Sequence, residues 1–355
     1  MGLGDHLDAG AAAGIISPEQ ARDLKRYIAA REAADAAGVG DGDAEQVRFA
    51  RGFHDVFLTI GLVILMVGIV ASAGIVIGTS AGFVGAGAAW LLAESYARAR
   101  RLVLPSIALA AGFVLMVAVA SGSCAQSILD SGTGAGEAPL PWSVLVGALA
   151  GLAASAGFLA RFGLPFAMGL VAASATASLA ALAEVAAPSR FDGLLQPLLL
   201  VAGAASFAAA MIHDLSDPGR RTPRADNAFW LHLVAAPLIV HSVAGAITGQ
   251  ETDLTFGQAG AVLGVLSGLG LVALIIDRRA LLVAGLAYLG VAVAVLVRGA
   301  AIDTGSVLAI TLLVVGTAVV LLGTGWRTAR RAVVETLVPP RIAASLPTLR
   351  DHPHE

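Results

Sequence analysis

Charged, aromatic and cysteine residues are all scarce in this chain of 355 residues: 13% are charged, 5% are aromatic, and Cys124 is the single cysteine. One cysteine excludes an intrachain disulfide, and the chain lacks the repeated Cys/His spacing of a structural zinc site. A net charge of −3 lacks the basic excess typical of nucleic-acid-binding proteins. We therefore expect no cofactor, no metal and no nucleic-acid partner.

Sequence motifs of enzymes are also missing. The chain has no HExxH zinc helix, no GxSxG nucleophile elbow within an apolar run and no P-loop. GLGD and GDGD lie in polar N-terminal sequence, unlike an intramembrane aspartyl-protease site. The tail DHPHE carries His352 and His354, but two histidines in a short tail are a weak pattern for metal binding. We expect that the chain is not an enzyme.

Apolar residues are abundant instead, at 57% of the chain, and the mean hydropathy is +0.83. This composition predicts an all-α polytopic membrane helical bundle, since a bilayer core of about 30 Å needs roughly 20 apolar residues in a helix. About ten such runs occur, of which the second is the shortest. They are Val56–Ile77, Ser80–Tyr96, Leu102–Gly122, Leu140–Ala160, Gly163–Ala187, Gly193–His213, Ala228–Gly249, Gly257–Ile276, Ala280–Val297 and Gly305–Gly325.

The distribution of Lys and Arg predicts that both termini are cytoplasmic, because basic residues are retained on that side. With ten spans, 20 of the 22 basic residues fall inside, and only Arg190 and Arg298 fall outside. The segment SCAQSILDSGTGAGEAP, predicted as the longest outer loop, has acidic residues and no Lys or Arg. About fifty mostly polar residues precede the first run, so we expect that span, rather than a cleaved signal peptide, to direct insertion.

The regions outside the spans have helical patterns of their own. In GIISPEQARDLKRY, Ser17 and Gln20 form a capping-box pattern around Pro18, and the sequence predicts a short helical hairpin. We expect four parts: the cytoplasmic N-terminal helices and linker (1–43), a juxtamembrane helix (44–55), the transmembrane domain (56–325), and an interfacial helix with its tail (326–355). Trp326 and the arginines after it are typical of an anchor at the cytoplasmic surface.

A family resemblance follows from three of these features: GIISPEQA, the basic juxtamembrane segment RFARGFHD and a Gly-rich first span. Together they resemble a family of uncharacterised bacterial polytopic inner-membrane proteins. The resemblance covers mainly residues 14–70 and the number of spans. It implies a multi-pass protein of the bacterial inner membrane and brings no activity or site residues.

Small residues recur at a spacing that allows helices to approach closely. Gly147 and Gly151 form one pair, and Gly260, Gly264 and Gly268 form a stripe. Packing within the chain is one interpretation. A homo-oligomer contact, in particular through the stripe, is the other.

Two histidines lie in the seventh run, FWLHLVAAPLIVHS. His232 and His241 are nine residues apart, which in a helix places them on opposite faces and about 13 Å apart, so they cannot share one metal. Pro237 between them predicts a kink. Small residues around both histidines predict that this helix is central, with neighbours on both sides.

Ionisable groups inside a membrane are costly and face the protein interior. Glu184 in the fifth run and Gln196 in the sixth fall at depths compatible with His241. We interpret His241, Glu184, Gln196 and Pro237 as a candidate intramembrane polar site in which Glu184 and His241 exchange protons, against the alternative of separate structural hydrogen bonds. His232 and Glu94 are secondary candidates, Glu94 being one turn from Arg98 and so suited to a surface ion pair.

Two functions remain open from the sequence. The first is transport of a small solute or ion, with proton coupling. The second is a non-transporting membrane scaffold or sensor that binds a cytoplasmic protein partner through the N-terminal helices. Deletion of those helices separates the two.

Overall fold

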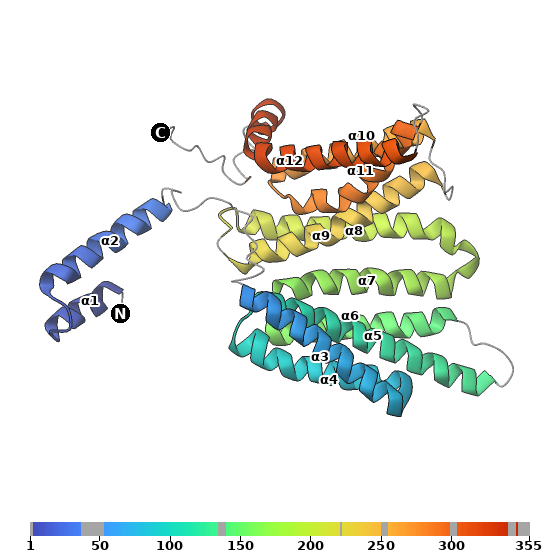
Figure 1. Cartoon of the computed structure of the whole chain (residues 1–355), viewed down its shortest axis with the longest axis horizontal. Coiled ribbons are helices and arrows are strands. Elements are labelled where there is room, and N and C mark those ends of the chain that lie inside the picture. The colour runs from blue at the N-terminus through green and yellow to red at the C-terminus, as the bar shows by residue number, and fades with distance from the viewer. Residues whose placement is uncertain are drawn as a thin grey trace. The chain divides into compact units, whose positions relative to one another are not determined.

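The computed structural model describes residues 3–36, 53–133, 140–220, 222–249, 255–298, 304–339 and 346. Within these ranges every regular element is a helix (Figure 1), as the all-α prediction requires. The chain divides into two compact units, one of residues 1–46 with 349–355 and one of residues 47–348. Three predicted features lie outside the described residues: the linker at 38–43, the juxtamembrane helix over 44–52, and the two histidines of the tail.

The smaller unit contains the predicted helical hairpin, α1 (Leu3–Ala12) and α2 (Pro18–Ala36). The capping box is present: the Gln20 backbone N–H donates to Ser17 Oγ at 3.1 Å, and the Ser17 N–H donates to Gln20 Oε1 at 2.9 Å. Lys25 of α2 pairs with Asp8 of α1, and Ala21 is buried at 3% exposure. A polar pair and a small buried residue therefore hold the two helices together.

The larger unit is built of ten helices in its described residues, one for each apolar run of the sequence. They are α3 (Phe53–Ile77), α4 (Ala81–Ala93, continued as a π-helix over Glu94–Ala99), α5 (Val103–Thr133), α6 (Leu140–Phe162), α7 (Pro165–Ala186), α8 (Phe191–Ser216), α9 (Pro223–Thr248), α10 (Phe256–Ile276), α11 (Ala280–Arg298) and α12 (Thr304–Leu337).

Eight helical stretches of the described residues are long and apolar enough to cross a membrane. This count takes Phe53–Ala99, which holds α3 and α4, as one stretch, and from α11 it retains only the shorter Tyr288–Val297. Side chains such as Ile64, Ile75 and Leu313 are 66%, 87% and 69% exposed. So much apolar surface fits lipid rather than water. The chain is therefore a multi-pass helical bundle by length and composition, and the number ten stays a prediction.

Two helices run further than the apolar pattern predicted. The third run was expected to end at Gly122, but α5 continues to Thr133, so much of the predicted outer loop is helical. Polar side chains bridge this extension, with Gln126 donating to Asp130 at 2.9 Å and Ser127 to the Ser123 carbonyl at 3.0 Å. Hydropathy marks where lipid ends, whereas a helix ends only where its backbone bonding stops.

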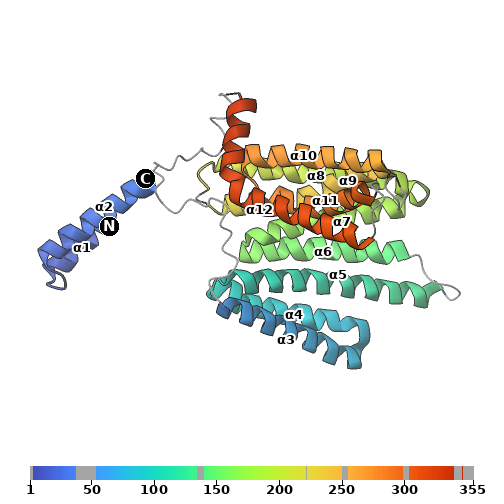
Figure 2. The same cartoon turned by 45° about the horizontal axis from the view of Figure 1, so that its top comes forward.

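At the other end of the unit, α12 is one helix through the predicted boundary at residues 325 and 326. Figure 2 shows that it changes direction along its length. The predicted last span and interfacial helix are thus one bent element.

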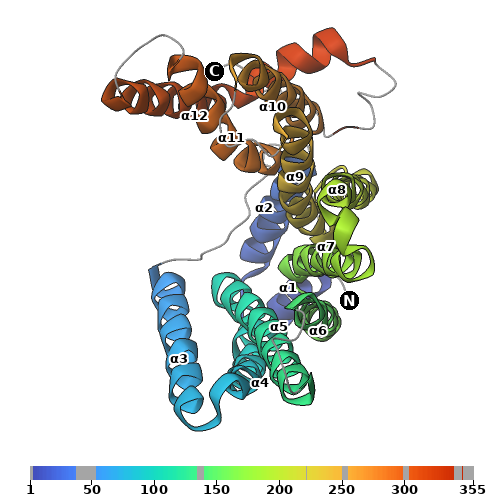
Figure 3. The same cartoon turned by 90° about the vertical axis from the view of Figure 1, so that its right-hand side faces the viewer.

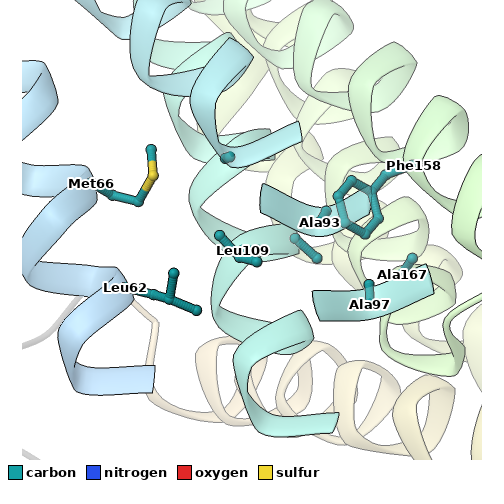
Figure 4. Close-up of a cluster of buried hydrophobic side chains, with 9 residues drawn as sticks. Leu62, Met66, Ala93, Ala97, Leu109, Phe158 and Ala167 are labelled. Carbon is teal, nitrogen blue, oxygen red and sulfur yellow. The ribbon is translucent and has the colours of Figure 1, made fainter. Parts of the chain in front are cut away.

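Helices of the larger unit pack mainly against their neighbours in sequence, which short connections favour. One core cluster joins α3, α4, α5, α6 and α7, and Figure 4 shows Leu62 and Met66 of α3 reaching toward Leu109. Helix α9 packs against α7, α8, α10 and α11, and Figure 3 shows it between these helices. The prediction that this helix is central, with neighbours on both sides, is confirmed.

Helices α5 and α6 approach closely at two glycines. A Cβ at Gly147 would lie 2.7 Å from the Ala118 carbonyl oxygen, and one at Gly122 would lie 2.9 Å from the Ser143 carbonyl oxygen. A Cβ at Gly151 would lie 3.2 Å from the Ala118 side chain, so the pair Gly147 and Gly151 serves packing within the chain. The stripe differs, because a Cβ at Gly260, Gly264 or Gly268 would meet nothing within 4 Å.

The close approach predicts that Gly147→Ala destabilises the bundle by about 1–3 kcal/mol, because the added methyl group must push α5 away. Thermal unfolding of the purified protein in detergent measures this as a lower apparent melting temperature. Gly157→Ala is the matched control, since a Cβ at Gly157 on the same helix meets nothing within 4 Å. Equal melting temperatures for the two variants would show that the contact does not constrain the helices.

Candidate ionic site at the α10–α11 turn

Two charged residues form the tight turn between α10 and α11. The Arg278 N–H donates to the Ala273 carbonyl at 2.9 Å, and the Asp277 N–H donates to the Leu274 carbonyl at 3.4 Å. This is the bonding of a Schellman motif, which needs a left-handed residue after the helix. Asp277 fills that position with φ of 58°, a conformation that Asp tolerates better than most residues. The turn therefore presents an acidic and a basic side chain side by side.

Arg278 is the centre of the first half of the site. Its guanidinium forms a bidentate contact with Asp214 of α8: Nε donates to Oδ2 at 3.1 Å and Nη2 donates to Oδ1. Nη2 also donates to the Ala225 carbonyl of α9 at 3.1 Å. The side chain is only 2% exposed, and that of Asp214 is 11% exposed. One buried arginine thus joins the turn to both α8 and α9.

His232 of α9 completes this half. Its Nε2 lies 2.9 Å from Asp214 Oδ2, and the residue has 0% exposure. An ionised carboxylate only accepts hydrogen bonds, so Nε2 carries a hydrogen, and in the neutral ring Nδ1 then holds a lone pair. Nδ1 is buried with no hydrogen-bond partner among the described residues, and the ring packs edge-on against the Phe207 ring of α8, with centroids 5.2 Å apart. A buried base therefore remains unpaired beside an ion pair.

Asp277 is the centre of the second half. Arg220, from the α8–α9 connection, donates to Asp277 Oδ2 at 3.2 Å and to the carbonyls of Ile276 and Asp277 at 3.1 and 2.7 Å. The negative end of the α10 helix dipole also stabilises a cation at these last carbonyls. Arg220 has φ of 51°, so both residues of this pair occupy the sparsely populated left-handed region. The hydrogen bonds between Arg220 and Asp277 help to hold both residues in this left-handed conformation.

Helix α12 contributes the remaining partners of Asp277. Trp326 Nε1 donates to Oδ1 at 2.8 Å, and Arg330 Nε lies 3.8 Å from the same oxygen. Arg279 stacks over the Trp326 ring at 5.3 Å. The sequence predicted Trp326 as a surface anchor, but it is 3% exposed and packs with Ala236 and Leu281. The prediction was wrong because composition cannot tell an interfacial tryptophan from one that packs in the core and donates to a partly buried carboxylate.

The start of α9 is fixed by the same region. Thr222 caps the helix, accepting from the Arg224 N–H at 3.3 Å, and Pro223 occupies the first turn. Asp217 accepts from the Thr222 N–H at 2.8 Å and from its hydroxyl at 2.7 Å. Asp217 and Thr222, which lie on either side of Arg220 in the chain, are therefore held together by two hydrogen bonds.

The residues predicted for the polar site fall elsewhere on α8 and α9. His241 is exposed, and its Nδ1 hydrogen-bonds the Tyr288 hydroxyl of α11. Gln196 of α8 is half-buried and accepts at its backbone carbonyl from Ser242 Oγ at 2.6 Å. Its side chain fills the space beside Gly245, where Oε1 is buried and finds no hydrogen-bond partner in the part of the chain that the structure describes. Gln196 thus packs on the residues that follow His241.

Glu184 is half-buried on α7, and it forms no hydrogen bond or ion pair within the described residues. None of the described hydrogen bonds joins it to His241, so proton exchange between the two stays a hypothesis. Pro237 is exposed in α9, which remains one continuous helix around it. Glu94 pairs with Arg98 at 3.4 Å, which confirms the predicted ion pair.

Sequence reasoning assigned Asp214 to the end of a span and Arg278 to an inside loop, and so missed their contact. They are 64 residues apart in the sequence, and no local sequence pattern predicts that they pair. The one signal was His232, a histidine surrounded by small residues in an apolar helix. Small neighbours mark close helix packing, where an ionisable group needs a partner.

Comparison with protein-family models, with curated proteins and with solved structures finds no match to this chain.

We predict that breaking the ion pair of Asp214 and Arg278 lowers the free energy of unfolding strongly. Asp214→Asn or Arg278→Gln leaves the other charge buried and unpaired, which costs about 3–5 kcal/mol. In the double variant the loss falls well below the sum of the two, because neither charge is stranded. Apparent melting temperatures in detergent measure these effects. Glu335→Gln is the control, since Glu335 is 61% exposed and 4.0 Å from Arg331; a loss in Asp214→Asn no larger than in this control contradicts the role of the pair.

Proposed function

We propose that the chain is a ten-span transporter of a small solute or ion in the bacterial inner membrane, and that the coupled proton binds at His232. One observation carries the proposal: His232, Asp214 and Arg278 form a buried ionisable cluster where three segments of the apolar bundle meet. Ionisable groups among membrane helices are costly and mark substrate paths and proton relays. The family resemblance supports the bacterial setting.

The proposed coupling starts at His232. In the neutral ring Nδ1 has a buried lone pair with no donor among the described residues, so a proton can bind there while Nε2 keeps its bond to Asp214. The imidazolium then gives Asp214 a second cationic partner and adds one positive charge beside Arg278. Repulsion between the two cations weakens the grip of Arg278 on Asp214. The turn between α10 and α11 is then free to separate from α8, and loss of the proton restores the closed state.

We infer the cytoplasmic placement of the site from the distribution of basic residues. The contacts of the larger unit support it, because residues assigned to inside segments meet one another. Arg161 contacts Glu94, and Arg220, Arg278 and Arg330 all belong to the ionic site. Two features support the count of ten spans. One of the eight apolar stretches, Phe53–Ala99, contains two helices joined by a turn at residues 78–80. Helix α11, which is not among the eight, is 19 residues long.

If the chain is a transporter whose proton binds at His232, we predict a solute-dependent current that requires His232. Proteoliposomes on a solid-supported membrane are exposed to pools of amino acids, sugars, carboxylates and inorganic cations under a pH gradient. We expect a transient current for the native chain with at least one pool. His232→Gln lowers the current at least about tenfold, since amide nitrogen binds no proton in this range. Glu335→Gln leaves it unchanged.

Two further variants separate the ionic site from the site predicted from sequence. His241→Gln and Glu184→Gln keep the current if His232 carries the proton, and abolish it if the pair of α7 and α9 does. Folding of each variant is checked by its melting temperature. A current in His232→Gln equal to that of the native chain, with the same pH dependence, rules out the proposed proton site.

A scaffold or sensor is the second candidate, and the separate N-terminal unit favours it. That unit exposes apolar side chains in its hairpin: Ile15 is 78% exposed, Tyr27 60% and Leu24 48%. Exposed apolar residues on a small helical unit are typical of a docking surface for a cytoplasmic partner.

Deletion of residues 1–43 distinguishes the two candidates. For a transporter, we expect membrane insertion and the solute current to survive, because the ionic site lies wholly in the larger unit. For a scaffold, insertion survives and the cellular function is lost. Membrane fractionation and the current assay on the truncated chain measure both, and loss of the current with intact insertion would contradict an autonomous transport unit.

A further inference from the structure

A second group of charges, the arginine cluster, is made up of Arg98 and Arg161, which contact Glu94, and of Arg100 and Arg101, which follow Arg98 in the chain. Glu94 begins the π-helical end of α4, and it accepts from Arg161 of α6 at 2.8 and 3.0 Å. Arg98 reaches the same carboxylate at 3.4 Å. One carboxylate therefore holds two guanidinium groups from two helices in place. π-Helical turns inside α-helices are frequent at functional sites.

The other two arginines of the cluster have no acidic partner within the described residues. Arg100 and Arg101 are both exposed. Arg100 stacks over the Tyr96 ring at 5.4 Å, which orients its guanidinium without neutralising it. Four arginines against one glutamate leave an excess of three positive charges. The cluster is therefore a cationic surface, because its positive charge exceeds the single negative charge of Glu94.

An aromatic layer lies one helical turn below the arginine cluster. Trp90, four residues before Glu94, packs against Phe162 at 5.1 Å and Phe158 at 6.0 Å. Phe113 of α5 joins them at 5.2 Å from Trp90. These rings belong to the core of the bundle, with Phe158 at 0% exposure, and they hold the ends of α4 and α6 together. The cluster directly follows the apolar helix α4, and arginines just beyond an apolar span are typical of the membrane–water interface. We therefore infer that it lies at the depth of lipid headgroups.

We propose that the arginine cluster binds the phosphate of an anionic phospholipid. Guanidinium groups match phosphate oxygens in planar, paired hydrogen bonds, which favours Arg over Lys at such sites. Leu91 is 70% exposed in the last turn of α4, directly before the π-helical segment that carries Arg98. The exposed leucine gives an acyl chain a surface beside the headgroup. A free phosphate gains nothing from that apolar surface, and this favours the lipid.

Native mass spectrometry of the full-length protein in detergent tests the proposal, with phosphatidylglycerol and phosphatidylcholine titrated separately. We expect phosphatidylglycerol to bind more tightly. In Arg100→Gln/Arg101→Gln its apparent Kd rises about tenfold, because two unpaired cations are lost. These two residues carry no ion pair with a described acid, so the variant keeps the contacts of Glu94. Its melting temperature checks the fold.

The matched control is Arg22→Gln/Arg26→Gln, which removes the same charge from the exposed surface of α2 in the smaller unit. Binding of phosphatidylglycerol stays at the native level in this control if the site is local. An equal loss in both double variants reduces the effect to overall charge and overturns the site. Equal binding of the two lipids also overturns it. Inorganic phosphate that displaces phosphatidylglycerol at equal molar concentration assigns the cluster to a free anion, against the lipid.

Discussion

Backbone hydrogen bonding in an apolar solvent is the constraint on which the rest of this structure depends. A bilayer core offers no water to backbone N–H and C=O groups, so each spanning segment must satisfy them internally as a helix. The ten helices of the larger unit follow from this requirement, and so does the freedom of α5 and α12 to continue past the apolar runs. Once helices are obligatory, the remaining question is what holds them together, since lipid provides little hydrophobic drive between them.

Small residues provide part of the answer. Where Gly122 and Gly147 face one another, the backbones of α5 and α6 approach so closely that a Cβ would lie under 3 Å from a carbonyl oxygen. Helix α9 uses alanines in the same way, with Ala228, Ala235 and Ala236 fully buried. Dispersion contacts grow as the backbones approach, so a chain rich in Ala and Gly forms a tight bundle without large side chains.

Ionic contacts provide the other part at the α10–α11 turn. Asp277 and Arg278 are adjacent, yet they bind different partners: Arg278 joins α8 and α9, while Asp277 joins the α8–α9 connection and α12. A buried charge is stable only with a partner of good geometry, so these contacts specify how four segments meet. In the proposed mechanism the same property couples the turn to a proton at His232, because a charged neighbour changes which pairing is favoured.

Composition and periodicity alone determined the all-α class, the placement of the helices, the capping of α2, the central position of α9 and the ion pair of Glu94 with Arg98. These are local properties, or properties of one helix in its solvent. The tertiary structure alone decided that Asp214, His232 and Arg278 meet, that Trp326 lies buried beside Asp277, and that Arg161 shares Glu94 with Arg98. Each of these pairs joins residues of different helices, or of a helix and a turn, 18 to 67 positions apart. Which face of one helix meets which face of another depends on packing, and no single stretch of sequence records it.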